Sequence, residues 1–231
     1  MPSPLQDPAL EALLDRLHAQ SDAQADEIHA YFSRRAREGT LDPEGFDDDA
    51  HRFLADKLVA LDRDKALLCY QLCRALCATR VVEAGTSFGV STLYLAAAVR
   101  DTLAAAPPSG ARQGVVIGTE YEAHKAEVAR KHFREAGLED VIELREGDLR
   151  TTLRDPGGPV DFMLVDIWDV ALPALELVAP SLRPGAIVVC DNTAAHAEAY
   201  RDYFRFVNDP GNRLRTLTLP FDGGLELTVR V

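Results

Sequence analysis

Apolar side chains in the first third of the chain recur at the spacing of an amphipathic helix. Leucines at positions 5, 10, 13, 14 and 17 lead into Ile28, Tyr31 and Phe32, which predicts a helix over residues 5–38. Glycines and a proline between residues 39 and 45 break this pattern. Two further helices are predicted over residues 47–61 and 64–78, so the chain opens with a helical region.

At residue 81 the pattern changes to short apolar runs separated by helical segments. Val81 and Val82 predict a buried strand, because β-branched residues favour strands. The predicted strands cover residues 81–82, 114–119, 141–145, 160–166 and 186–190, and helices are predicted over residues 92–99, 122–136, 170–180 and 195–207. Two closing strands, 214–219 and 224–231, flank a glycine-containing turn and favour an antiparallel hairpin. The alternation predicts an α/β fold with a doubly wound, Rossmann-like sheet.

These patterns divide the chain into two parts of one domain. Residues 1–78 are too few for a separate enzyme, and we expect them to form a helical cap over the site or an oligomer contact. Residues 79–231 are expected to form the binding core, with a ligand above the carboxyl ends of the strands. A chain of 231 residues with 47% hydrophobic content is long enough for one larger domain.

The net charge of the chain limits the classes of partner that it is expected to bind. The formal net charge is −12 and the pI is about 4.9, so the basic surface that nucleic acid or an anionic membrane requires is not expected. No apolar run approaches the roughly 20 residues that span a bilayer. The first residues lack the basic and apolar regions of a signal peptide. We therefore expect a cytoplasmic protein that binds neither nucleic acid nor membranes.

A short glycine loop follows the first strand. Glu83 ends the strand, Gly85 and Gly89 bracket the loop, and a helix follows. The spacing differs from the G-x-G-x-x-G that holds a pyrophosphate. An acidic residue before the loop suits a cationic ligand, such as the amino group and sulfonium of S-adenosylmethionine. A glycine turn that binds no ligand remains the alternative.

Further carboxylates follow the next two strands. Glu120 stands at the tip of the second strand, where an acidic side chain can accept hydrogen bonds from both ribose hydroxyls of an adenosine. Asp148 follows the third strand and is predicted to meet the adenine amino group. An acidic residue at a helix N-terminus is the structural alternative for Glu120.

The fourth and fifth strands end in oxygen-bearing side chains. Asp166 follows one strand, and Asp191 and Asn192 follow the other. Three oxygen ligands at one edge suit a hard divalent cation such as Mg²⁺ or Ca²⁺. Each residue alone is more often a helix cap than a ligand. Their convergence on one edge favours a metal site.

Taken together, these motifs resemble those of the cation-dependent O-methyltransferases, the group of catechol and caffeoyl-CoA O-methyltransferases. The resemblance runs from about residue 55 to the C-terminus. It rests on the order and spacing of V-E-A-G-T-S-F-G-V-S at 82–91, Glu120, E-G-D at 146–148, L-V-D at 164–166, L-R-P-G-A at 182–186, D-N at 191–192 and L-P-F-D-G-G-L at 219–225.

The resemblance implies a seven-stranded sheet with an antiparallel last strand, a homodimer and a small-molecule methyl acceptor. It also implies two sets of site residues. The S-adenosylmethionine contacts would be Glu83, Gly85, Ser91, Glu120, Asp148 and Asp166. The metal ligands would be Asp166, Asp191 and Asn192. In such a site the cation lowers the pKa of the acceptor hydroxyl and fixes its position.

The chain departs from the family pattern after the fourth strand. The family commonly has Asp-x-x-Lys there, whereas this chain has Asp166-Ile167-Trp168-Asp169. Three consequences stay open: Asp169 is itself the base, the acceptor is an amine or a different hydroxyl, or methyl transfer is lost. His196 is a second candidate base, with a structural role as its alternative.

The sequence thus predicts an S-adenosylmethionine-dependent methyltransferase, metal-assisted and acting on oxygen. One alternative is a protein that binds the cofactor without catalysis, which Asp169 favours. Another is an NAD-dependent oxidoreductase on a similar sheet. The acidic residue before the loop and the different glycine spacing argue against the oxidoreductase.

Overall fold

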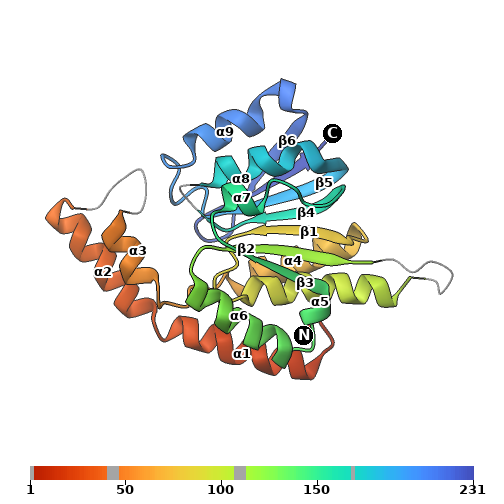
Figure 1. Cartoon of the computed structure of the whole chain (residues 1–231). Coiled ribbons are helices and arrows are strands. Elements are labelled where there is room, and N and C mark those ends of the chain that lie inside the picture. The colour runs from red at the N-terminus through yellow and green to blue at the C-terminus, as the bar shows by residue number, and fades with distance from the viewer. Residues whose placement is uncertain (1–2, 41–46, 107–112, 168–169) are drawn as a thin grey trace.

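The computed structural model describes residues 3–40, 47–106, 113–167 and 170–231 (Figure 1). Four helices precede the sheet: α1 (Pro8–Asp22), α2 (Ala25–Glu38), α3 (Asp48–Leu54) and α4 (Arg63–Ala75). The strands are β1 (Arg80–Ala84), β2 (Val115–Glu120), β3 (Ile142–Glu146), β4 (Val160–Val165), β5 (Leu182–Asp191), β6 (Leu214–Leu219) and β7 (Leu225–Arg230). The helices between them are α5 (Val90–Ala104), α6 (Ala123–Glu135), α7 (Leu149–Thr152), α8 (Ala171–Val178) and α9 (Arg201–Asn208).

The seven strands form one sheet in the order β3-β2-β1-β4-β5-β7-β6. The first five strands pair in parallel, and β7 runs antiparallel to both β5 and β6. The chain reverses its direction of travel along the sheet between β3 and β4, so the carboxyl ends of β1 and β4 flank the topological switch point. The predicted doubly wound sheet with an antiparallel last strand is confirmed.

Each face of the sheet is covered by its own apolar core. Phe162 and Leu164 of β4 pack with residues of α1, α4, α5 and α6, while Met163 and Val165 pack with residues of α7, α8 and α9. Figure 1 shows these two groups of helices on opposite sides of the sheet. Because successive strand residues point to opposite faces, a strand buried on both sides is apolar on both, as β4 is from Phe162 to Val165.

The predicted helix over residues 5–38 is two helices. Asp7 caps α1 by accepting from the Leu10 amide (3.1 Å), and the chain turns at Ala23 and Gln24 before α2 begins. Figure 1 shows α2 leaving α1 in a new direction. The leucine repeat ends at Leu17, so only α1 has an apolar stripe to hold it on the core.

The helix predicted over residues 47–61 ends early, at Leu54. The chain then runs without regular structure to α4, and side chains hold its backbone amides. The Leu58 amide donates to Gln24 (3.0 Å) and the Ala60 amide donates to Ser21 Oγ (3.1 Å). Because these contacts come from the junction between α1 and α2, they could not be read from the local pattern.

Helices α2 and α3 form an arm that extends away from the sheet in Figure 1. The rings of Tyr31 and Phe53 stack with centroids 3.8 Å apart, and Arg35 pairs with Asp47 through Nη1–Oδ1 (2.7 Å). Gly39 ends α2 in the left-handed conformation, at φ +67°. The arm is therefore held together mainly by its own side chains.

Two more boundaries differ from the prediction. Strand β5 begins at Leu182 and includes Pro184 and Gly185, whereas the apolar pattern predicted a start at 186. Helix α9 begins at Arg201 instead of 195, because the chain after Asn192 first makes a series of turns. None of the helices in the described ranges is long and apolar enough to cross a bilayer.

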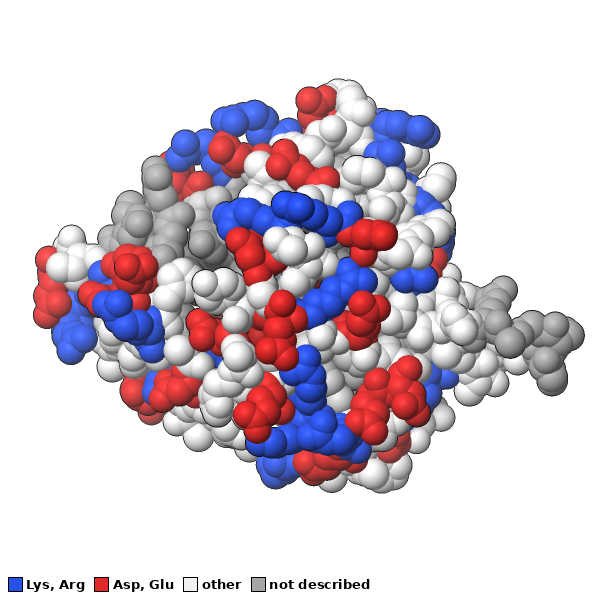
Figure 2. Space-filling view, in the orientation of Figure 1, with Lys and Arg blue, Asp and Glu red and all other residues white. Residues whose placement is uncertain are grey.

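Acidic and basic side chains are interspersed over the face in Figure 2. Several of them form ion pairs at the surface, such as Lys131 with Glu127 (2.8 Å) on α6. Exposed pairs of this kind contribute little to stability, with a median of about 0–1 kcal/mol. The fold is therefore stabilised chiefly by its two apolar cores.

Candidate functional site

The glycine loop between β1 and α5 is shaped by close packing of the chain. Gly85 has a φ of +97°, and a Cβ there would lie 2.3 Å from the Asp166 carbonyl oxygen. Gly89 has a φ of +84°, and a Cβ there would lie 2.4 Å from the Phe133 ring. Both positions therefore require glycine for the fold itself, independently of any ligand.

Glu83 lies beneath this loop and is fully buried (0% exposed). Its carboxylate accepts hydrogen bonds from Ser91 Oγ (2.7 Å), Thr86 Oγ1 (2.9 Å) and Thr92 Oγ1 (2.5 Å). Burial raises the pKa of Glu83, and the three hydroxyl donors oppose that shift. In this arrangement Glu83 fixes the loop to the first turn of α5, and its contact with a cofactor stays a prediction, as do those of Gly85 and Ser91.

Glu120 stands at the end of β2, on the other side of the loop. Its Oε2 accepts from the Ser87 amide (2.6 Å), and its Oε1 accepts from the Glu122 amide (2.8 Å). Ser87 is held in the left-handed region, at φ +49°. Glu120 therefore positions the loop through the Ser87 amide. Its carboxylate lies at the edge of the sheet formed by the carboxyl ends of β1, β2, β4 and β5, which we call the rim, and the sequence predicted a ribose contact there.

Asp166 and Asp191 lie side by side at the ends of neighbouring strands. Val165 pairs with Cys190, so the next residue of each strand projects at the same edge. The Asp166 amide donates to the Ala84 carbonyl (3.0 Å), which places this residue against the glycine loop. Burial raises the pKa of Asp166, and the neighbouring Asp191 and Glu83 carboxylates raise it further.

A buried lysine from α4 reaches this edge. The Lys65 side chain is 2% exposed, and its Nζ lies 2.8 Å from Asp191 Oδ1 and 2.9 Å from Asp62 Oδ2. Burial alone would lower the pKa of Lys65, but its bonds to Asp191 and Asp62 raise it, so the ammonium stays charged. The sequence analysis missed Lys65, since its spacing from Asp62 points only to a local helix pair.

The second oxygen of Asp191 also has a donor. Asn192 Nδ2 lies 3.1 Å from Asp191 Oδ2, and Asn192 takes a left-handed backbone, at φ +60°. Turning the amide over would place its oxygen against an ionised carboxylate, so the donating orientation is favoured. One Asp191 oxygen therefore forms an ion pair with an ammonium group, and the other accepts a hydrogen bond from the Asn192 amide.

The predicted metal ligands, as arranged here, do not fit a divalent cation. The prediction required three oxygens from Asp166, Asp191 and Asn192, yet Asp191 is paired with an ammonium and Asn192 presents its amide nitrogen. Among the residues that the structure describes, no three His, Cys, Asp or Glu side chains are grouped to hold a metal ion. The prediction failed to include Lys65, which lies outside the predicted binding core and supplies the positive charge that balances the Asp191 carboxylate.

Three predicted residues remain: Asp148, His196 and Asp169. Asp148 is exposed and caps α7 by accepting from the Arg150 amide (2.8 Å). His196 lies in the turns before α9, and its amide donates to the Asn192 carbonyl (3.1 Å). Asp169 lies outside the described residues, as does the neighbouring Trp168. Their predicted roles as adenine contact, bases and pocket wall remain predictions.

A small cavity lies between the glycine loop and the segment 58–61. Its walls include Gly85, Ser87, Ser91 and Asp166. The N-terminal part of the chain thus supplies one wall of the site. Asp166 is the one carboxyl group among these lining residues, and Glu83, Glu120 and Asp191 lie close to the cavity, with Lys65 paired to Asp191, so the surroundings of the cavity are rich in carboxyl groups. Such a site fits a ligand that has a positive charge, as S-adenosylmethionine does.

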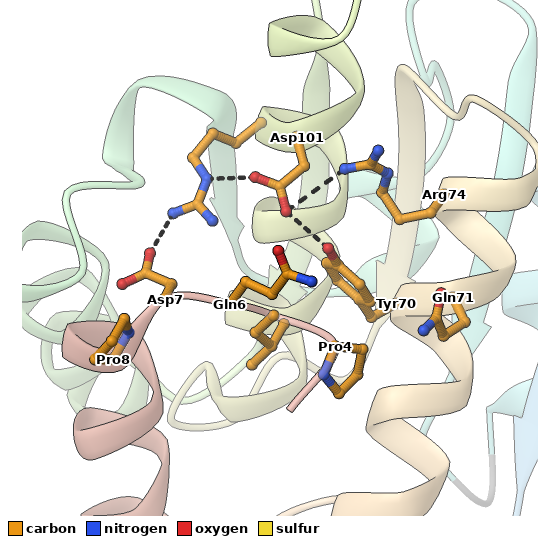
Figure 3. Close-up of a pocket in the computed structure, with 10 residues that line it drawn as sticks. Pro4, Gln6, Asp7, Pro8, Tyr70, Gln71, Arg74 and Asp101 are labelled. Carbon is orange, nitrogen blue, oxygen red and sulfur yellow. Dashed lines mark hydrogen bonds and ion pairs between the residues drawn. The ribbon is translucent and has the colours of Figure 1, made fainter. Parts of the chain in front are cut away.

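A second cavity, of about 690 Å³, lies away from this rim, between the N-terminus, α4 and α5 (Figure 3). Its charged side chains compensate one another. Asp101 accepts from Tyr70 (2.8 Å) and pairs with Arg74 (3.6 Å), and Arg100 Nη1 lies 2.7 Å from Asp7. The charge of this cavity is thus balanced by its own residues, and the glycine-loop rim is the candidate site.

Comparison with known proteins points to one family. A family model described as a methyltransferase domain matches residues 82–193, the stretch from β1 to the residues just after β5. A catechol O-methyltransferase of Mycobacterium tuberculosis is 35% identical over 123 residues, which cover 52% of this chain and 51% of the relative. The chain thus spans about half the length of that relative. A catechol O-methyltransferase of Niastella koreensis is 30% identical over 165 residues, covering 64% of this chain and 67% of the relative.

Solved structures share the fold over almost the whole chain. An O-methyltransferase from Bacillus cereus in complex with SAH has a TM-score of 0.65 at 20% identity, covering 98% of this chain and 92% of that chain. An O-methyltransferase from Streptomyces achromogenes in complex with SAM has a TM-score of 0.62 at 24% identity, covering 89% and 96%. With the sequence matches over the strand ends that form the site, these findings confirm the predicted resemblance: the chain belongs to the S-adenosylmethionine-dependent O-methyltransferase family that includes the catechol O-methyltransferases.

Proposed function

We propose that this chain transfers a methyl group from S-adenosylmethionine to a hydroxyl group of a small molecule. The observation that carries the proposal is the cluster of carboxyl groups beside the glycine loop, in which Lys65 pairs with Asp191. Asp166 lines the cavity there, and its pKa is raised by burial and by two neighbouring carboxylates. A cationic ligand relieves that repulsion. The relatives named catechol O-methyltransferase support a hydroxyl as the acceptor.

The residues of the chain bind and orient in this proposal. S-adenosylmethionine, when bound, supplies a methyl group on a positively charged sulfur. Glu120 fixes the loop through the Ser87 amide and offers its carboxylate at the rim. The first turn of α5, a helix of 15 residues, favours a carboxylate at its N-terminus. Segment 58–61 forms one wall of the cavity, and a wall that keeps water from a bound ligand strengthens the electrostatic interactions there.

The acceptor must lose a proton as its oxygen bonds to the methyl carbon. The carbon–sulfur bond breaks in the same step, and its electron pair stays on sulfur. Asp169 and His196 remain the candidate bases for the proton. None of these steps passes through a divalent cation, because the Asp191 carboxylate is already paired with Lys65.

Calorimetric titration tests the binding half of the proposal. The chain should bind S-adenosylmethionine and not NAD. Glu120→Gln should weaken S-adenosylmethionine binding about 10- to 100-fold, because a charged acceptor is lost. Glu122→Gln is the matched control, since its side chain is exposed and only its backbone amide contacts Glu120. Binding of NAD alone would refute the proposal and revive the oxidoreductase alternative.

A second candidate is a protein that binds S-adenosylmethionine without transferring its methyl group. Asp169 favours it, because the family commonly has a lysine at this position. Mass spectrometry of a catechol panel, with the chain and with Asp169→Lys, separates the two. Methylated product from the natural chain supports transfer. Product from Asp169→Lys alone favours a binding protein.

We also propose that the chain acts as a homodimer, as the family resemblance implies. The arm of α2 and α3 supports this idea, because it extends away from the sheet and is held chiefly by its own contacts. Sedimentation velocity of the whole chain at micromolar concentration should give the mass of a dimer. A monomer that still binds S-adenosylmethionine would remove the dimer from the proposal and leave the binding site intact.

A further inference from the structure

Lys65 forms a buried ion pair with Asp191 at the edge of the sheet beside the glycine loop. It lies near the beginning of α4, outside the strand–helix units that build the site, yet its ammonium reaches Asp191 at the end of β5 (2.8 Å). Both side chains are almost fully buried, at 2% and 5% exposed. This ion pair is therefore part of the packed interior and is not a solvated surface contact.

Such a pair is costly as a stabilising device. Removing two charges from water costs several kcal/mol per ion, and an apolar pair of similar size is often as stable or more stable. The Lys65–Asp191 pair sits beside Asp166 in the candidate site. A structural role alone does not explain why the positive charge is placed there.

The geometry indicates that the Lys65 ammonium balances the negative charge of Asp191 at the rim. Lys65 Nζ faces one Asp191 oxygen, and Asn192 Nδ2 faces the other. A divalent cation at Asp191 would have to displace the ammonium and also bring the Asn192 amide oxygen to the place of its nitrogen. The positive charge that a cation would supply is therefore already part of the polypeptide.

We propose that Lys65 replaces the divalent cation at this rim, so that the site binds and works without metal. This inference rests on the proposed methyl transfer for its catalytic part only. Lys65 acts through Asp191, which makes it a positioning residue. The bonds formed and broken are those of the proposed transfer: oxygen bonds to carbon, the carbon–sulfur bond breaks, and the acceptor proton leaves to a base.

Binding of Mn²⁺ alone, followed by electron paramagnetic resonance and by thermal unfolding, tests the inference without any turnover. The natural chain should bind Mn²⁺ only at millimolar concentration or more weakly. Lys65→Ala, which frees Asp191, should bind it at least about tenfold more tightly and unfold at a higher temperature in its presence. Adding Asp191→Asn to Lys65→Ala should abolish the gain.

Two matched variants separate this role from a structural one. Lys57→Ala removes a lysine that also pairs with two carboxylates, Glu27 (3.4 Å) and Asp56 (3.1 Å), but lies outside the rim, so Mn²⁺ affinity should not change. Lys65→Arg keeps the charge and should exclude Mn²⁺ like the natural chain. A Lys65 whose role is only structural would not alter Mn²⁺ affinity when replaced.

Each measurement has an outcome that would overturn the role proposed for Lys65. Micromolar Mn²⁺ binding by the natural chain, or no gain in a folded Lys65→Ala, overturns the inference. If Lys65→Ala does not fold, the titration of the natural chain and of Lys65→Arg still decides. Methyl transfer that stops in EDTA and returns with Mg²⁺ also overturns it. Absence of all methyl transfer, with S-adenosylmethionine bound, refutes the proposed reaction and leaves the Mn²⁺ test standing.

Discussion

Two aspartates at opposite ends of β4 have opposite surroundings. Asp161, near the beginning of the strand, accepts from the amides of Thr79 (2.8 Å) and Arg80 (2.9 Å) and pairs with Arg183 (2.5 Å). Burial alone would raise the pKa of Asp161, but these donors lower it. Asp166, just beyond the end of the strand, is next to other carboxylates, and its pKa is raised.

The difference separates a structural carboxylate from a functional one. At the amino end of the strand every charge has its donor, so the aspartate stabilises the fold. At the carboxyl end Lys65 compensates Asp191, whereas burial and the neighbouring carboxylates raise the pKa of Asp166 to about 8. A protein keeps such unfavourable surroundings where a ligand relieves them, at the cost of some stability. The carboxylate at the amino end of β4 therefore stabilises the sheet, and the carboxyl group at its other end is available to bind a ligand.

The largest effect is expected at Lys65. Lys65→Met retains the apolar stem and removes the charge, which leaves the buried Asp191 without its cation. The free energy of unfolding at pH 7, from urea titration, should fall by about 3 kcal/mol. Lys57→Met, whose partners Glu27 and Asp56 are mostly exposed, should cost under about 1 kcal/mol. Equal losses for the two variants would show that the rim depends on no special charge.

At the other end of β4, Asp161→Asn should cost about 2 kcal/mol at pH 7, because a charged acceptor of three donors becomes neutral. The folded pKa of Asp161 lies below its unfolded value, so its stabilisation is complete above about pH 4 and is lost as the pH falls through the folded pKa. Urea titrations at pH 7 and pH 3 should show the difference between variant and natural chain shrinking. A constant difference would rule out the charge as its source.

Asp166→Asn is the counterpart of that variant and should behave differently. It replaces a carboxyl group whose pKa is raised to about 8 by a neutral amide of similar size, so the free energy of unfolding at pH 7 should stay the same or rise by up to about 1 kcal/mol. Calorimetry should show S-adenosylmethionine binding weakened about tenfold, since an amide cannot ionise to offset the positive charge of the ligand. A clear loss of stability without loss of binding would show that Asp166 has a structural role like that of Asp161. The proposed difference between the two ends of β4 would then be wrong.

The smallest effect is expected far from both aspartates. Arg16 and Glu135 pair at 2.6 Å, but both side chains are more than half exposed. Glu135→Gln should change the free energy of unfolding by less than about 0.5 kcal/mol in urea at moderate salt. It calibrates the scale on which the changes at the two ends of β4 are measured. A loss near that of Asp161→Asn would mean that burial does not distinguish these carboxylates.

Much of the fold and part of the site could be predicted from local pattern. The alternation of apolar runs predicted the order of strands and helices, and the turn after Leu219 predicted the hairpin of β6 and β7. Glu83, Glu120, Asp166 and Asp191 were predicted at strand ends because each directly follows an apolar run. The break after α1, the early end of α3 and the late start of α9 were not predicted, and for α3 the reason is that Ser21 and Gln24 hold the backbone that follows it.

The amino-acid sequence by itself determined the doubly wound sheet and the gathering of carboxyl groups at one edge, because the hydrophobic period is a local property and parallel strands end at the same edge. Its motifs also carried the resemblance to the family, which the matched relatives confirm. Only the tertiary structure decided what each carboxylate meets. Glu83 finds three hydroxyls from its own loop and helix, whereas Asp191 meets Lys65 from α4, far earlier in the chain. Charge compensation depends on distance in space, and packing of α4 against the sheet is what brings that ammonium to the rim.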